Sequence, residues 1–143
     1  MGFKRETRVE WLKYWTSKPV QERPKVIMIQ ETHITSEAEA VELEREWQRL
    51  WGQKHDQRLT YWSIGSTKSG GVAVLVAPEV ASTIQPWQQH LWTNRQLGIL
   101  AGDHAILNIY APVDPPAARE TFFKKMKQWK LGQHTKVIRG QAK

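Results

Sequence analysis

The chain lacks cysteine and has no long apolar run, and these two absences narrow the classes of protein to which it can belong. Without cysteine it has no disulfides and no thiolate metal sites, so any metal ion must be held by oxygen or histidine ligands. Such ligands favour Mg²⁺, Mn²⁺ or Ca²⁺. No apolar stretch approaches the roughly 18 residues of a membrane-spanning helix, and no secretory signal follows Met1. We therefore expect an intracellular protein, cytoplasmic or nuclear, with no membrane association.

Positive charge is concentrated at the C-terminal end of the chain. Residues 119–143 hold eight Lys and Arg against one Glu, which accounts for the whole net charge of +7, while residues 1–118 are balanced. A positive end on a neutral body favours contact with nucleic acid phosphates. A solvated helix face followed by a basic tail is an equally good interpretation.

The 143 residues suffice for one domain with a hydrophobic core, and a hydrophobic content of 40% is typical of a folded protein. Apolar periodicity predicts a helix over residues 4–16 and another that begins at Ser36, where Ser36 and Glu39 form a capping box, and ends at Gly52. A third helix follows Pro116 and turns Phe122, Met126 and Trp129 inward. Apolar runs predict five strands: 26–30, 59–64, 71–77, 96–101 and 104–110.

Turn residues join the second predicted strand to the third and the fourth to the fifth, as in β-hairpins. The order of elements indicates an α/β fold with a largely antiparallel sheet. The uninterrupted apolar run 26–30 is typical of a strand buried on both faces in the middle of a sheet. We expect a domain over residues 1–131 and a basic C-terminal tail over 132–143.

Glu31 stands where the first apolar run stops. Open α/β sheets bind ligands at the carboxyl ends of their strands, and a carboxylate there must be hydrated, paired or bound to a metal ion. On spacing alone, a Glu that meets solvent or an Arg is the better interpretation.

Three phrases occur in a recognisable order, and together they are fairly specific: Val26-Ile27-Met28-Ile29-Gln30-Glu31-Thr32-His33, Ser69-Gly70-Gly71-Val72-Ala73-Val74-Leu75-Val76 and Leu107-Asn108-Ile109-Tyr110-Ala111-Pro112. The chain thereby resembles the endonuclease/exonuclease/phosphatase superfamily, and most closely the apurinic-endonuclease-like domain of non-LTR retrotransposons. The resemblance covers roughly residues 8–130 and implies a DNase I-like α/β-sandwich of which this chain is a truncated N-terminal half.

The resemblance implies roles for two residues. Glu31 matches the Glu that binds the divalent cation, Mg²⁺, near the scissile phosphate, and Tyr110 matches the active-site Tyr that hydrogen-bonds the phosphate. A carboxylate-bound Mg²⁺ neutralises phosphate charge, as phosphodiester hydrolysis requires. The pair Gly70-Gly71 has a structural role as a turn, and His33 is more often a hydrogen-bonded structural residue than a base.

Several family features are missing. The chain begins with a helix in place of the strand that carries a metal-site Asn, and no terminal Ser-Asp-His phrase supplies a catalytic His. At the counterpart of the family's Gly-Asp-x-Asn phrase, Gln141 replaces the Asp and Lys143 the Asn. Without these groups hydrolysis loses its general acid–base contributions, and Glu31 alone holds Mg²⁺ weakly. We expect little or no nuclease activity.

An incomplete sandwich has a further consequence. If the chain supplies mainly one sheet with its flanking helices, an apolar face is left uncovered, and we expect a homodimer or a protein partner to cover it. The alternative to a weak retrotransposon-type endonuclease is therefore a catalytically dead binding module that uses this face and the basic residues of the last helix, Lys124, Lys125, Lys127 and Lys130. A third alternative is an unselected gene fragment.

Overall fold

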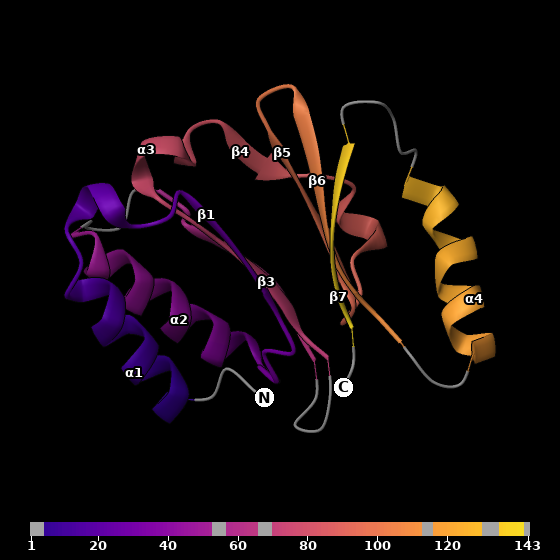
Figure 1. The fold of residues 1–143 in the computed structure, drawn as a ribbon, viewed down its shortest axis with the longest axis horizontal. Helices are drawn as coiled ribbons and strands as arrows, with labels where there is room; N and C mark the ends of the chain where they lie inside the picture. Colours follow the sequence, from indigo (N-terminus) through magenta and orange to yellow (C-terminus); the bar gives the residue numbers. More distant parts are fainter. Residues whose placement is uncertain (1–4, 53–56, 66–69, 113–115, 130–134, 142–143) are drawn as a thin grey trace.

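Two β-sheets lie face to face between helices (Figure 1) in the structure, a computed structural model that describes residues 5–52, 57–65, 70–112, 116–129 and 135–141. The first sheet has the order β1 (Val26–Gln30), β3 (Val72–Val76), β2 (Thr60–Ser63), with both pairs antiparallel. The second has the order β4 (Ile84–Pro86), β5 (Gln96–Ala101), β6 (His104–Ala111), β7 (Thr135–Gln141). Its first two pairs are antiparallel, whereas β7 runs parallel to β6.

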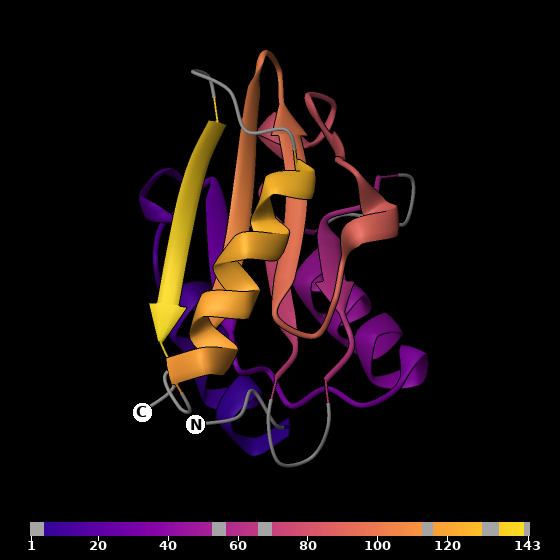
Figure 2. The same cartoon turned by 90° about the vertical axis from the view of Figure 1, so that its right-hand side faces the viewer.

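Helices cover the outer face of each sheet. The helices α1 (Arg5–Thr16) and α2 (Glu37–Leu50) lie on the side of the three-stranded sheet (Figure 1), and α4 (Pro116–Lys125) crosses the outer face of the four-stranded sheet (Figure 2). Short helical turns complete the connections: α3 (Pro78–Ala81), η1 (Val20–Glu22), η2 (Gln89–Leu91) and η3 (Met126–Trp129). No helix in the described ranges is both long and apolar enough to span a membrane.

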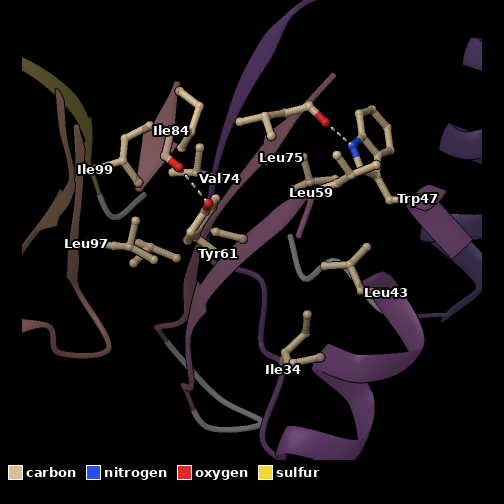
Figure 3. Close-up of a cluster of buried hydrophobic side chains, with 14 of the residues drawn as sticks. Ile34, Leu43, Trp47, Leu59, Tyr61, Val74, Leu75, Ile84, Leu97 and Ile99 are labelled. Carbon is tan, nitrogen blue, oxygen red and sulfur yellow. Dashed lines mark hydrogen bonds between the residues drawn. The ribbon is translucent and has the colours of Figure 1, made fainter. Parts of the chain in front are cut away.

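The main core extends from α2, on the outer side of the three-stranded sheet, across that sheet to the inner face of the four-stranded sheet. It includes Leu43 and Trp47 from α2, Val74 from β3 and Leu97 from β5, all of them buried (Figure 3). Two hydrogen bonds tie polar atoms of aromatic side chains into this core: the Trp47 indole donates to the Val76 carbonyl at 2.8 Å, and the Tyr61 hydroxyl to the Ile84 carbonyl at 3.3 Å. A second cluster lies between β6 and α4.

Strand β6 separates these two cores by its alternation. Leu107 and Ile109 point to the outer face and pack with Met126 and Trp129 of η3, directly after α4, while Ile106 and Tyr110 pack against the main core. The period of two therefore directs Tyr110 toward the three-stranded sheet, and the predicted inner face of the last helix is confirmed.

The predicted start of α2 is confirmed with one difference. The Ser36 hydroxyl accepts a hydrogen bond from the Glu39 amide at 3.3 Å, as a capping residue does. The Glu39 carboxylate accepts from the Thr35 hydroxyl at 3.0 Å, a bond outside the reciprocal capping box. Arg8 of α1 is buried and forms ion pairs with Glu42 and Glu46, at 3.4 and 3.0 Å, which fix α1 on α2.

Two details of the predicted fold need correction. The chain supplies two sheets rather than mainly one, because residues 84–86 and 96–111 form a separate sheet whose inner face covers the first. Strand β1 lies at the edge of its sheet and is only half-buried, whereas the middle strand is β3, in which every residue is buried. Strand β3 is covered by a neighbouring strand on each side, whereas β1 has a neighbour on one side only, which accounts for the difference in burial.

The basic end of the chain is described only in part. Strand β7 extends to Gln141, and the division of the chain at residue 131 stays a prediction. Lys124 and Lys125 are exposed on α4, while Lys130 and the side chain of Lys127 lie outside what the structure describes. Because the two sheets bury their facing surfaces against each other, the predicted partner would have to bind elsewhere; association with a second copy or another protein stays a prediction.

Candidate active site

The two residues singled out in the sequence meet where the sheets face each other. Glu31 directly follows β1 in the first sheet, and Tyr110 is the last residue but one of β6 in the second. The side-chain amide of Gln30 donates to the Ile109 carbonyl at 3.0 Å, so the ends of β1 and β6 are in contact. At these joined strand ends the Glu31 carboxylate is close enough to the Tyr110 phenol that, besides burial, its charge raises the pKa of Tyr110.

Asn108 ties the two sheets together beneath this pair. Its side chain is fully buried, and its amide nitrogen donates to the Ile29 carbonyl of β1 at 3.2 Å and to the Ala73 carbonyl of β3 at 3.1 Å. Its oxygen accepts from the Gln30 amide at 2.9 Å. Asn108, two residues before Tyr110 on β6, is therefore hydrogen-bonded to both β1 and β3 of the other sheet. The sequence marked Asn108 only as part of a family phrase.

Glu31 and His33 both adopt a left-handed backbone conformation, with φ of 57° in each. Such a conformation costs about 1–3 kcal/mol for a residue other than glycine and persists only where the surroundings enforce it. Here backbone hydrogen bonds enforce it, because Thr32 donates to the Gly71 carbonyl at 3.0 Å and His33 to the Gly70 carbonyl at 3.1 Å. These conformations bring the side chains of Glu31 and His33 together, within 3.0 Å of each other.

Gly70 and Gly71 do more than form a turn. Both have positive φ, 81° and 87°. A Cβ on Gly71 would lie 2.2 Å from the Thr32 hydroxyl, and one on Gly70 2.6 Å from the Asn94 amide nitrogen. The backbone can approach the Glu31 segment this closely only without side chains, and the approach lets the Gly70 amide donate to a Glu31 carboxylate oxygen at 2.8 Å.

The Glu31 carboxylate is held at both oxygens and remains within reach of solvent. His33 Nε2 lies 3.0 Å from the oxygen that Gly70 does not occupy, and the Glu31 side chain is 19% exposed. Burial acts to raise the pKa of Glu31, but the Gly70 amide, the His33 hydrogen bond and the His33 charge together outweigh burial and lower it. Glu31 is therefore an anion at neutral pH.

Arg95 fixes Tyr110, a contact that the sequence did not indicate. The Tyr110 amide donates to the Arg95 carbonyl at 2.7 Å, the Arg95 guanidinium donates to the Tyr110 carbonyl at 3.1 Å, and the guanidinium carbon lies 5.4 Å from the ring centroid. Burial raises the pKa of Tyr110, and the charge of Glu31 raises it further against the opposing effect of Arg95. The phenol is therefore protonated and can donate a hydrogen bond at neutral pH.

Few metal ligands lie at this site. Among the described residues no group of three or more His, Asp or Glu side chains comes together, so Glu31 has only His33 beside it. A carboxylate has about four lone-pair positions, and the contacts from Gly70 and His33 leave some of them open. This donor set fits a Mg²⁺ ion bound through one carboxylate that takes its other ligands from water and a substrate phosphate.

Strand β7 brings the predicted counterpart of the Gly-Asp-x-Asn phrase to the same end of the sheet. It pairs with β6 so that Gly140 lies opposite Tyr110 and Gln141 opposite Ala111. The sequence places an amide, not a carboxylate, at residue 141. Lys143 lies outside the described residues. In its described part the site thus combines one anionic ligand, a phenol donor and a nearby guanidinium, a set that can bind a phosphodiester.

An AP endonuclease from Archaeoglobus fulgidus has a similar structure, with a TM-score of 0.53 and 17% sequence identity. The similarity covers 85% of this chain and 43% of the chain of that enzyme, so this chain spans less than half the length of its structural neighbour. At this identity the likeness concerns the fold, and it confirms the predicted α/β fold of DNase I-like type. Neither a protein-family model nor a curated protein matches the sequence.

Proposed function

We propose that this chain carries a site for metal-assisted phosphodiester cleavage on DNA, of the retrotransposon endonuclease type, and that its own cleavage rate is low. The observation that carries this proposal is the closeness of Glu31 and Tyr110, which lie at the joined ends of β1 and β6. They come from different sheets and lie far apart in the sequence, yet the buried Asn108 bonds and the strained Glu31 segment hold them together. Packing of a hydrophobic core by itself requires neither the buried Asn108 hydrogen bonds nor the strained backbone at Glu31.

Glu31 would hold the cation, which favours Mg²⁺ or Mn²⁺ as the cofactor. When bound, such an ion supplies neutralisation of phosphate charge and Lewis acidity. The chain's own contribution is to keep the carboxylate ionised and oriented. The Gly70 amide and His33 do this from two sides, which leaves the carboxylate little rotational freedom.

Tyr110 would bind the phosphate. Its protonated phenol donates a hydrogen bond to a phosphate oxygen, and Arg95, which packs on the ring, adds positive charge nearby. Neither group activates water. Because the described part of the site offers no second carboxylate and no separate imidazole to serve as base or acid, proton transfer is left to solvent, and general acid–base catalysis is typically worth 10²–10⁴-fold in rate. This is the reason for the low rate.

A plasmid-nicking assay with Mg²⁺ or Mn²⁺ tests the proposal. Glu31→Ala should abolish nicking. Glu10→Ala, which removes an exposed carboxylate from α1, should leave it unchanged. Binding of Mn²⁺ by calorimetry should be lost in the first variant only. Equal nicking by the natural chain and by Glu31→Ala would remove Glu31 from any mechanism and overturn the proposal.

A second candidate is a nucleic-acid-binding module without catalysis. The exposed pair Lys124 and Lys125 on α4 favours it, since exposed cations on one helix suit a phosphate backbone. The two candidates differ in one measurement. The module binds DNA with a steep salt dependence and yields no cleavage product with either metal ion.

A further inference from the structure

A pocket of about 490 Å³ lies between residues 93–96 and α4, and Arg95 in its wall contacts Tyr110. One wall is the backbone and side chains of residues 93–96, and the other is formed by Ala118, Phe122 and Lys125 of α4, with Pro112 between them at the end of β6. Its volume falls in the range of small-molecule sites. The sequence pattern did not indicate it.

This pocket shares its inner wall with the candidate active site. The Asn94 carbonyl accepts a hydrogen bond from the Gly71 amide at 2.7 Å, and the Asn94 side chain packs against Gly70. Arg95 contacts both the ring and the backbone of Tyr110. Arg95 therefore connects the pocket to Tyr110, and a strand whose phosphate lies on Tyr110 can continue past Arg95 into the pocket.

The lining of the pocket suits a nucleotide. Arg95 and Lys125 are its charged residues, and no described residue that lines it is acidic. No ion pair to a carboxylate is found for Arg95 or Lys125 within the described ranges, so two positive charges remain for a ligand. The ring of Phe122 and the side chain of Pro112 supply an apolar surface for a sugar or a base, as aromatic side chains do in sites for single strands.

We propose that this pocket binds the nucleotide adjacent to the phosphodiester held at Tyr110, with its phosphate at Lys125 and Arg95 and its sugar or base on Phe122. The proposal rests on the proposed function, of which it names a substrate subsite. The occupant is a nucleotide of a DNA strand rather than an acidic peptide, because the pocket combines two cations with an aromatic surface next to a phosphate site.

The test compares two neighbouring lysines of α4. Lys125 lines the pocket, whereas Lys124 is exposed on the same helix outside it. Binding of a fluorescein-labelled single-stranded oligodeoxynucleotide is followed by anisotropy in EDTA over a salt series, so that cleavage plays no part. Lys125→Ala should reduce the slope of log K against log salt by about 0.7, the value for one phosphate contact to a single strand, and Lys124→Ala should reduce it by less.

Filling the pocket without changing charge gives a second, independent readout. Ala118→Trp, with its fold checked by circular dichroism, should weaken oligonucleotide binding by about tenfold, the loss expected for one stacked base. Equal effects of the two lysine variants, unchanged binding by Ala118→Trp, or equal affinity for an oligoglutamate peptide would each overturn the subsite. A selective effect of Lys125 without any nicking would instead reject the proposed hydrolysis and retain the subsite.

Discussion

Removal of the Asn108 side chain should destabilise the protein more than removal of any exposed amide. Asn108→Ala eliminates three hydrogen bonds at once, two from its nitrogen to the Ile29 and Ala73 carbonyls and one to its oxygen from Gln30. Asn108 is fully buried, so water does not replace these bonds. Gln30 keeps its bond to the Ile109 carbonyl, which limits the damage on that side.

The magnitude follows from the number of bonds. At about 1 kcal/mol for each hydrogen bond, with a further contribution from carbonyls left unsatisfied in the core, the loss in unfolding free energy is about 3–4 kcal/mol. A domain of this size has a total of roughly 5–15 kcal/mol. With a urea slope of about 2 kcal/mol per molar, the midpoint should fall by roughly 1.5–2 M.

Urea unfolding followed by tryptophan fluorescence measures this change. The matched control is Gln85→Ala, which removes an amide from an exposed position of strand β4 and should shift stability by no more than about 0.5 kcal/mol. If Asn108→Ala lowers the midpoint no more than Gln85→Ala, the amide does not hold the two sheets together, and the account of how Glu31 meets Tyr110 is wrong.

Two further predictions concern the Glu31 segment. Gly71→Ala should cost about 2–3 kcal/mol in urea unfolding, because a positive φ is combined with a Cβ 2.2 Å from the Thr32 hydroxyl, while Gly52→Ala, with a φ of 70° and open space, should cost about 1 kcal/mol; equal losses would exclude the contact as the cause. The lowered pKa of Glu31 contributes stability that is present above the ordinary glutamate pKa and is lost as the pH falls through the folded-state value. The stability of the natural chain should therefore fall toward that of Glu31→Gln in acid, and a difference independent of pH would contradict the assignment.

Local patterns in the sequence were sufficient for most helices and hairpins. Ser36 begins α2, and the β5–β6 hairpin turns at Gly102, where φ is 62°. These features depend on neighbouring residues, and so spacing and capping chemistry predict them. The edge position of β1 was not predictable in the same way, since a half-buried edge strand and a buried middle strand can have the same apolar run.

The site could be predicted only through the resemblance, which pointed to Glu31 and Tyr110. Their contact depends on how one sheet lies on the other, and no local pattern encodes that distance. The left-handed conformation at Glu31 was equally hidden, because Glu is not among the residues enriched in it. Histidine is enriched there, but a single His in the sequence does not mark the conformation of His33. The contact of Arg95 with Tyr110 was not predictable from local sequence, because Arg95 directly precedes β5 and the contact crosses from there to β6.

The strain at Glu31 and His33 supports the proposed ligand site over the alternative of an unselected fragment. Two strained residues, at about 1–3 kcal/mol each, lower the stability of the fold, and a core requires neither. Two glycines must stay without side chains so that one amide can reach the Glu31 carboxylate. Relaxing Glu31 and His33 would remove this cost but would disturb the backbone hydrogen bonds of Thr32 and His33 to Gly71 and Gly70 and the bond from the Gly70 amide to the carboxylate. The strain thus supports the proposed role of an oriented carboxylate. The same reasoning holds whether or not cleavage follows binding, because an oriented anion beside a phenol would already serve the proposed metal ion and phosphate.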